Sequence, residues 1–258
     1  MTRRMILAAA AAVSMSLAGG ALAQGHAGHH NAAPSAAVAA AIADPGRPAA
    51  DKERDANRKP AEMLAFAGVA PGMKVADFIP GGGYFTRIFA KAVGPTGKVY
   101  AVTSPPPANA PNPPAIRAVA ADPAYGNIQV VEGDFQSFTL PEQVDVVWTS
   151  QNYHDLHQRR RNLDIAQVNK AIFNALKPGG VFVVLDHAAK AGTPIDPDDA
   201  LHRIDPAAVR REVEAAGFKY EGESTVLRNP QDDHGKNVFD PSIRGHTDQF
   251  IYKFRKPR

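Results

Sequence analysis

The chain has 258 residues, of which 44% are hydrophobic and 21% are charged, and it contains no cysteine. Such a chain is long enough to bury a large core without cross-links, as one large domain or two small ones. The absence of cysteine excludes disulfide bonds, iron–sulfur clusters and cysteine zinc sites. A formal net charge of +3 without a long basic run argues against a nucleic-acid-binding surface.

The first 23 residues have the pattern of a secretory signal peptide. Arg3 and Arg4 precede an apolar, alanine-rich run from Met5 to Leu17, and Ala21-Leu22-Ala23 has the small residues of a cleavage site. The run is too short to span a bilayer, so we expect a periplasmic or secreted protein with no stable membrane segment after cleavage. The paired arginines also resemble a twin-arginine signal, which would export the folded chain.

Residues 24–45 are rich in Ala, Gly, Pro and His, which predicts a flexible linker before a domain at 46–258. His26, His29 and His30 could bind a divalent ion loosely, but the prediction is a mobile polar tail, because no fixed further ligand accompanies them. The charged stretch 44–60 predicts a solvated helical approach to the core, with an edge of an active site as the alternative.

From residue 60 onward, short apolar segments typical of strands alternate with segments of helical periodicity. Strands are expected at 74–79, 98–102, 128–131, 144–148, 181–185, 220–227 and 249–254, and helices at 61–69, 84–93, 116–121, 164–176 and 206–216. Short strands separated by helices indicate parallel pairing with right-handed crossovers. The predicted fold is therefore an α/β, doubly wound, mostly parallel seven-stranded sheet with an antiparallel C-terminal hairpin strand.

The most informative motif is the turn after the first of these strands, where Gly81, Gly82 and Gly83 precede a helix. Glycines let the backbone approach a ligand and adopt positive φ, and the start of a helix offers N–H groups to an anion. A tight packing turn without a ligand is the alternative, since a glycine-rich turn alone has low specificity.

Three further motifs follow in a fixed order along the chain. They are Gly133-Asp134 after the third strand, Val144–Trp148 as the fourth, and Leu176-Lys177-Pro178-Gly179-Gly180 before the fifth. With the glycine turn they resemble the class I S-adenosylmethionine-dependent methyltransferases over residues 60–254, including an exported group of that family. The resemblance implies a Rossmann-like fold, S-adenosylmethionine as cofactor and methyl transfer to a small-molecule or exported acceptor. It does not indicate an oligomeric state.

The resemblance also implies a set of cofactor-binding residues: Asp77, Gly81, Gly82, Gly83, Tyr84, Thr103, Asp134, Phe135 and Asn152. Asp77 would orient the turn or the amino-acid end of the cofactor. Asp134 would accept a hydrogen bond from the adenine amine, with the Phe135 ring beside it. Structural alternatives remain, with Asp77 as a cap, Phe135 as a core residue and Asn152 as a partner of loop backbone.

Two positions depart from the family pattern. Ile79 stands where the family usually has a glycine, and Pro80 follows it, so the turn is bulkier and stiffer. Thr103 ends the second strand, where the family usually has an acid that binds the ribose hydroxyls. A hydroxyl makes a weaker hydrogen bond than a carboxylate, so we expect weak cofactor affinity or a different nucleotide-like ligand.

The candidate catalytic residues, Tyr153, His154 and Asp155, follow the fourth strand. By the resemblance Gln151, Asn152 and Tyr153 would face the methyl group and its acceptor. His154 is a candidate general base, and Asp155 is either a base or a helix cap. The sequence predicts no metal site, because no clear carboxylate set completes His154 and the nearby His157.

Two alternatives concern the acceptor and the activity itself. Arg203 or Arg244 could bind an anionic acceptor, although surface ion pairs would explain them equally well. An exported, non-catalytic ligand-binding or regulatory protein on the same fold is the alternative to an enzyme. Thr103 and the export signal favour it, because S-adenosylmethionine is made in the cytoplasm, whereas the glycine turn and Gly133-Asp134 favour the enzyme.

Overall fold

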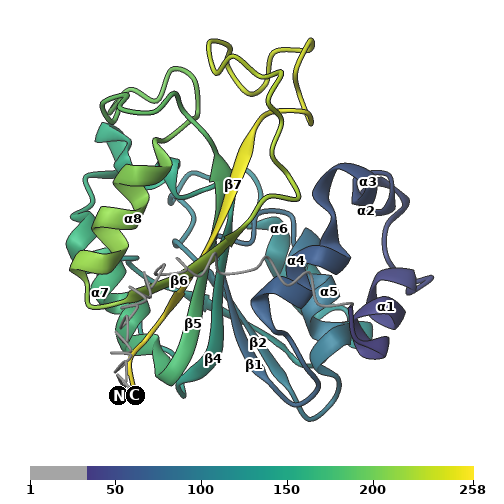
Figure 1. Ribbon diagram of the computed structural model, residues 1–258. Helices are drawn as coiled ribbons and strands as arrows, with labels where there is room; N and C mark the ends of the chain where they lie inside the picture. The colour runs from purple at the N-terminus through teal and green to yellow at the C-terminus, as the bar shows by residue number, and fades with distance from the viewer. Residues whose placement is uncertain (1–33) are drawn as a thin grey trace, which may run out of the picture.

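The computed structural model describes residues 34–258, which form one sheet covered by helices on both faces (Figure 1). The predicted signal peptide at 1–23, His26, His29 and His30 lie outside the described residues. Within the described range, no helix is long and apolar enough to cross a membrane.

The sheet has seven strands in the order β3-β2-β1-β4-β5-β7-β6. The bounds are β1 Lys74–Phe78, β2 Lys98–Thr103, β3 Ile128–Glu132, β4 Val144–Ser150, β5 Leu176–His187, β6 Lys219–Ser224 and β7 Gln249–Arg255. Strands β1 to β5 pair in parallel, whereas β7 is antiparallel to both of its neighbours, β5 and β6. The predicted fold is confirmed, with β7 lying inside the sheet and β6 at its edge.

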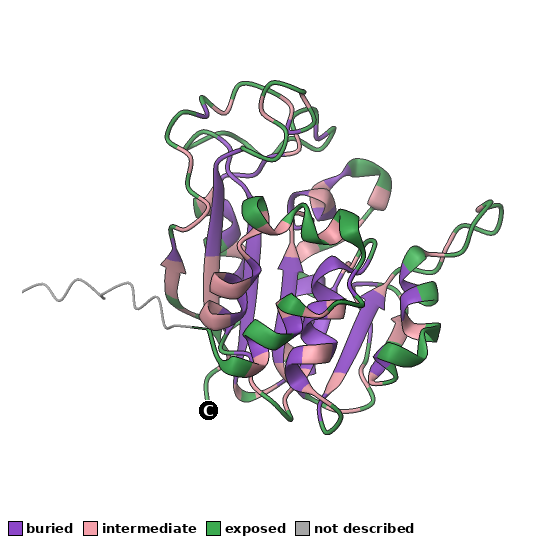
Figure 2. Cartoon of the chain, turned by 90° about the vertical axis from the view of Figure 1, so that its right-hand side faces the viewer, coloured by how far each residue is buried: buried purple, intermediate pink, exposed green. Residues whose placement is uncertain are grey.

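Helices cover both faces of the sheet, because apolar side chains point alternately to either side of each strand. The bounds are α1 Ala36–Ala43, α2 Ala49–Lys52, α3 Asp55–Arg58, α4 Pro60–Ala67, α5 Tyr84–Val93, α6 Ala115–Ala121, α7 Ile165–Ala175 and α8 Pro206–Ala215, with 3-10 turns η1 Pro123–Tyr125, η2 His154–His157 and η3 Arg159–Arg161. Val75 of β1 belongs to a core cluster with residues of α1, α4, α5 and α6, while its neighbour Ala76 belongs to a second cluster with residues of α7 and α8. The inner strands β1, β2, β4 and β5 are accordingly buried on both sides, whereas the edge strands β3 and β6 are partly exposed (Figure 2).

Part of the expected linker at 24–45 is helical, which corrects the prediction there. Ser35 caps α1 by accepting a hydrogen bond from the Val38 backbone N–H. Val38 and Ala41 are buried in the same core cluster as α4 and α5. The alanine-rich composition that suggested a mobile segment also has high helix propensity, and the apolar face of α1 finds a partner on α5.

Candidate functional site

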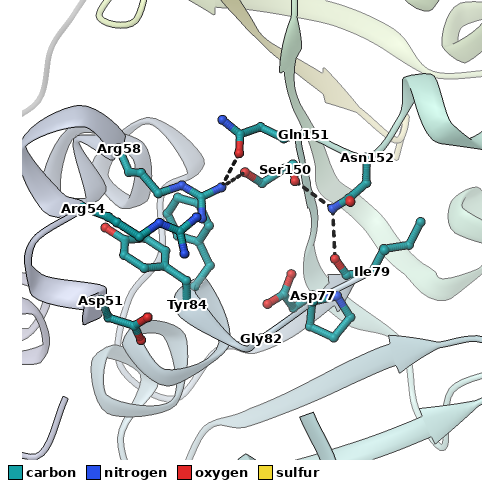
Figure 3. A pocket seen from close by; sticks show the side chains of 13 residues that line it. Asp51, Arg54, Arg58, Asp77, Ile79, Gly82, Tyr84, Ser150, Gln151 and Asn152 are labelled. Atoms are coloured by element: carbon teal, nitrogen blue, oxygen red, sulfur yellow. Dashed lines mark hydrogen bonds between the residues drawn. The ribbon is translucent and has the colours of Figure 1, made fainter. Parts of the chain in front are cut away.

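A cavity of about 210 Å³ opens at the carboxyl ends of β1 and β4 (Figure 3). Ligands of doubly wound sheets bind at this edge, where the strand order reverses. Three segments supply its lining residues, which are Asp51, Arg54 and Arg58; Asp77, Ile79, Pro80, Gly81, Gly82, Tyr84 and Phe85; and Ser150, Gln151 and Asn152. The cavity is smaller than a typical site for a whole drug-sized ligand, so it suits one end of a larger molecule.

The three glycines of the turn have different roles. Gly81 and Gly82 line the cavity, and a Cβ atom added to either would meet no atom within 4 Å. Gly83 does not line it. At φ +82° a Cβ on Gly83 would lie 3.1 Å from Val119 Cγ2 and 3.2 Å from Ile116 Cδ1. Gly81 and Gly82 therefore leave space for a ligand, whereas Gly83 lets α6 pack against the start of α5.

Ile79 and Pro80 line the cavity without closing it. Ile79 has φ +64°, a left-handed conformation that is rare for a β-branched residue. Asn152 braces it, because its Nδ2 donates to Ile79 O at 3.0 Å and to Ser150 O at 2.7 Å (Figure 3). Asn152 thus lines the cavity, as expected of a cofactor-binding residue, and also binds loop backbone, which was the alternative role expected for it.

Asp77 provides a buried carboxyl group on the cavity wall. Thr86 Oγ1 donates to its Oδ2 at 2.6 Å. Burial raises the pKa of Asp77 to about 7, although the Thr86 hydrogen bond and the charge of Arg58 oppose the rise. A cationic group in the cavity would favour the ionised form of this carboxyl.

Arg58 faces Asp77 across the cavity from helix α3. Its Nη2 donates to Ser150 Oγ at 3.1 Å and to Gln151 Oε1 at 2.8 Å, and its guanidinium lies 4.7 Å from the centre of the Tyr84 ring. Burial, with repulsion from Arg54, lowers the pKa of Arg58 to about 10, so it stays charged at neutral pH.

Tyr84 lines the cavity, as predicted, and is held by a buried polar network. Its hydroxyl donates to Asp55 Oδ1 at 2.6 Å, and Arg47 binds both oxygens of the same carboxylate, at 2.7 and 2.8 Å. Asp51 accepts from Arg87 at 2.9 Å. With Arg54 and Arg58 on one side and Asp77 on the other, the cavity can bind a ligand end that carries both a carboxylate and an ammonium group.

Sequence reasoning missed Asp51, Arg54 and Arg58 as cavity residues and treated 44–60 mainly as a solvated approach. The signal that could have found them is the charge density of this stretch directly before the first predicted core helix at 61–69. The alternative interpretation of residues 44–60, as an edge of an active site, agrees with the observed geometry.

Thr103, Asp134 and Phe135 do not line the cavity. Thr103 and the Gly133-Asp134 motif follow β2 and β3, which continue the same sheet edge beyond β1. Asp134 is exposed and its Oδ1 accepts from the Gln136 N–H at 3.0 Å. Phe135 is buried against Phe78, with ring centres 4.8 Å apart, so it is a core residue rather than an open surface for adenine.

The predicted catalytic residues also lie outside the cavity lining, which corrects their placement. Tyr153 is fully buried, donates to Glu212 Oε2 at 3.0 Å and accepts from Asn169 Nδ2 at 2.8 Å. Burial, the charge of Glu212 and its hydrogen bond hold the pKa of Tyr153 well above its usual range. It cannot approach an acceptor without losing this network.

His154 is buried beside Asp186, and its Nδ1 lies 2.7 Å from Asp186 Oδ1. Burial alone would lower its pKa, but Asp186, with Asp155 and Asp199, raises it to about 9. The imidazole ring of His154 is therefore protonated at neutral pH, and in this state it cannot accept a proton as a general base. Asp155 accepts from the side chain of Gln158 and does not serve as an N-cap.

Arg203 and Arg244 were alternative clamps for an anionic acceptor. Arg203 is buried and paired with Asp232, Nη1 to Oδ2 being 2.8 Å, so it has a structural partner. Arg244 lies over the exposed ring of Phe239, 5.9 Å from its centre.

Residues 77–184 match the sequence profile of the family described as a methyltransferase domain. The chain is also 31% identical over 138 residues to the ubiquinone/menaquinone biosynthesis C-methyltransferase UbiE of Ectopseudomonas mendocina, an alignment that covers 51% of this chain and 48% of that protein. The chain therefore spans about half the length of the curated relative it matches.

Solved structures share the fold at low sequence identity. A SAM dependent methyltransferase from Aquifex aeolicus superposes with a TM-score of 0.56 at 17% identity, covering 81% of this chain and 98% of that one. The cyclase SpnF has the same TM-score of 0.56 at 19% identity, covering 81% of this chain and 82% of its own. These likenesses establish the architecture and leave the reaction to be argued from the site.

Proposed function

Because residues 77–184 match the methyltransferase domain family, we propose that the chain is a class I S-adenosylmethionine-dependent methyltransferase and transfers the methyl group of S-adenosylmethionine to a small-molecule acceptor. The observation that carries the proposal is the polar cavity at the glycine turn. In the proposed complex, Arg54 and Arg58 bind the carboxylate of the cofactor's amino-acid end, and the Asp77 carboxylate attracts its ammonium group.

The rest of the cofactor would extend over the backbone of Gly81 and Gly82 and along the sheet edge towards Thr103 and Asp134. Methyl transfer from a sulfonium needs mainly in-line alignment of the acceptor. The protein's part is therefore to fix both ends of the cofactor and to admit the acceptor beside the β4 loop. We assign no proton transfer to Tyr153, His154 or Asp155, because each is engaged in buried or half-buried polar contacts.

Calorimetric titration with S-adenosylmethionine and its demethylated product tests the binding step. We expect the natural chain to bind both, and Gly82→Val to weaken binding at least tenfold by filling space beside the cavity. Gly126→Val is the matched control, because its Cβ would meet only an ordinary contact, 3.8 Å from Pro123 O. Folded protein that binds neither compound would contradict the proposal.

A non-catalytic ligand-binding protein is the second candidate, favoured by the uncharged Thr103 hydroxyl at the end of β2. Incubation with methyl-labelled S-adenosylmethionine and a panel of phenols, quinols and amines separates the two. Binding without label transfer to any compound would favour the second candidate, whereas a labelled product establishes turnover.

We also propose that the chain is exported, on the evidence of the signal pattern at 1–23. Fractionation of cells should place the full chain in the periplasm or medium, and a chain lacking residues 2–23 should remain inside. The double variant R3K/R4K keeps the positive charge of the signal but removes the arginine pair. If it blocks export, the route is the twin-arginine one.

A further inference from the structure

Four potential metal ligands converge after the carboxyl end of β4, from two segments far apart in the sequence. His154 and Asp155 belong to η2, after β4, and Asp199 and His202 belong to the loop between β5 and α8. One ligand atom from each of the four lies within 4.8 Å of all the others. The sequence did not predict this group, because His157 is the only other histidine close enough along the chain to suggest a partner for His154, and His157 Nε2 instead lies 3.0 Å from Glu212 Oε1.

The distances between neighbouring ligand atoms fit a small four-coordinate ion. His154 Nε2 lies 3.7 Å from Asp155 Oδ1 and 4.0 Å from Asp199 Oδ2. His202 Nδ1 lies 3.9 Å and 2.9 Å from the same two oxygens. Ligands of a tetrahedral zinc ion with bonds of about 2.0–2.1 Å are separated by about 3.3 Å, so small side-chain shifts would complete the shell.

A second shell of hydrogen bonds already orients these ligands. The Nδ1 of His154 is bound by Asp186, a fully buried carboxylate that also accepts from the His154 backbone N–H at 2.8 Å. This contact turns Nε2 towards Asp155 and Asp199. A histidine whose other nitrogen is held by a carboxylate is the usual arrangement around protein-bound metals. Gln158 Nε2 donates to both ligand carboxylates, which fixes them while leaving each a lone pair.

The charges of the cluster also favour a cation. Asp155, Asp186 and Asp199 bring three carboxylates together around His154, and the guanidinium of Arg161 lies 3.8 Å from Asp155 Oδ2. A divalent ion bound at His154 Nε2 would replace the proton on that nitrogen and supply a larger positive charge at the same place. Carboxylates gathered in a half-buried place repel one another unless a positive charge lies between them.

We propose that His154, Asp155, Asp199 and His202 bind one divalent transition-metal ion, for which zinc is the best match. Two imidazoles with two carboxylates suit zinc better than calcium or magnesium, which prefer six or more oxygen ligands. The ion would join the loop at 190–205 to η2 above the carboxyl edge of the sheet, where Figure 1 shows that loop standing clear of the sheet. This inference does not depend on methyl transfer.

Zinc binding by the untagged full chain, measured by calorimetry and by metal content after dialysis, tests the proposal. The triple variant H26A/H29A/H30A serves as background, because those histidines could bind zinc themselves. We expect one ion per chain in this background, a rise in the unfolding temperature with zinc, and affinity at least thirtyfold weaker in H202A and D199N. H246A, which removes an exposed histidine outside the cluster, should bind zinc unchanged.

Absence of zinc binding in the triple variant, or unchanged affinity in H202A, would overturn the proposal. Unfolding of the metal-free variants controls for misfolding: H202A is the least disruptive, because 27% of the His202 side chain is exposed. If D199N does not fold, D155N replaces it and should weaken zinc binding equally.

Discussion

At the scale of single residues, substitution of two neighbouring glycines in one turn should affect different properties. Gly82→Val should weaken ligand binding, whereas Gly83→Val should lower stability. Gly83→Val places a β-branched residue at φ +82° and presses its Cβ against Val119 and Ile116. We expect it to lower the free energy of unfolding by about 3 kcal/mol, through backbone strain and overpacking. Urea unfolding beside Gly82→Val measures this, and equal stability of the two variants would contradict the division of roles.

Asp77 gives the fold a pH dependence of its own. Burial raises the pKa of Asp77 to about 7 from an ordinary value of 3.8. Between these values the folded chain holds a proton that the unfolded chain has lost, so this group makes the free energy of unfolding fall as pH rises.

Asp77→Asn removes that titration. By linkage, the variant should gain on the order of 2–4 kcal/mol over the natural chain between about pH 4 and about pH 8. The measurement is urea unfolding of both proteins across this range. Parallel pH profiles would show that Asp77 keeps an ordinary pKa.

At the scale of elements, the short helices α2 and α3 complete a site whose other walls belong to the sheet. Arg58 of α3 binds Ser150 at the end of β4 and the following Gln151, and it lies on the Tyr84 ring of α5. Both hydrogen bonds leave from one nitrogen, Nη2, so the other guanidinium nitrogens stay available to a ligand carboxylate, whereas a lysine has a single nitrogen to share among all these partners.

Arg58→Lys should therefore weaken S-adenosylmethionine affinity about tenfold, or about 1.4 kcal/mol. Adenosine, which lacks the amino-acid end, should bind both proteins alike, and this comparison localises the effect. Calorimetry with the two ligands is the measurement. An equal loss for adenosine would place the arginine elsewhere in the complex.

At the scale of the whole molecule, the buried pair Arg203–Asp232 holds together two long loops above the sheet. Arg203 Nη1 also donates to Ala188 O at 3.0 Å and its Nε to Lys236 O at 2.9 Å. Arg203→Met leaves the Asp232 carboxylate buried without a counter-charge, and should cost about 3–5 kcal/mol in thermal or urea unfolding. The double variant R203M/D232L should recover part of that loss, and full additivity of the single changes would contradict the pairing.

The sequence predicted the fold well because its signals are local. Strand and helix periods, the glycine turn and the apolar strand β4 depend on residues close together in the chain. Helix α5 has the predicted bounds, whereas β5 begins earlier than expected, at Leu176.

The site was harder to predict, because its polar contacts join distant segments. Tyr153 is turned inward by Glu212 and His154 by Asp186, partners 59 and 32 residues away. Arg58 reaches a cavity residue 93 positions farther along. A dense run of charged residues usually forms a solvated surface, so the charge density of residues 44–60 alone could not decide between such a surface and the edge of a site.

The two walls of the cavity come from differently matched parts of the chain. Gly81, Gly82 and Asn152 lie inside the profile match at 77–184, and Asp51, Arg54 and Arg58 lie before it. The ten residues 49–58 can thus be exchanged without changing a strand residue, and they contact the sheet through Arg58, which binds Ser150 at the end of β4. Evolution, or an engineer, could retune which charged ligand the scaffold accepts by rewriting that short stretch alone.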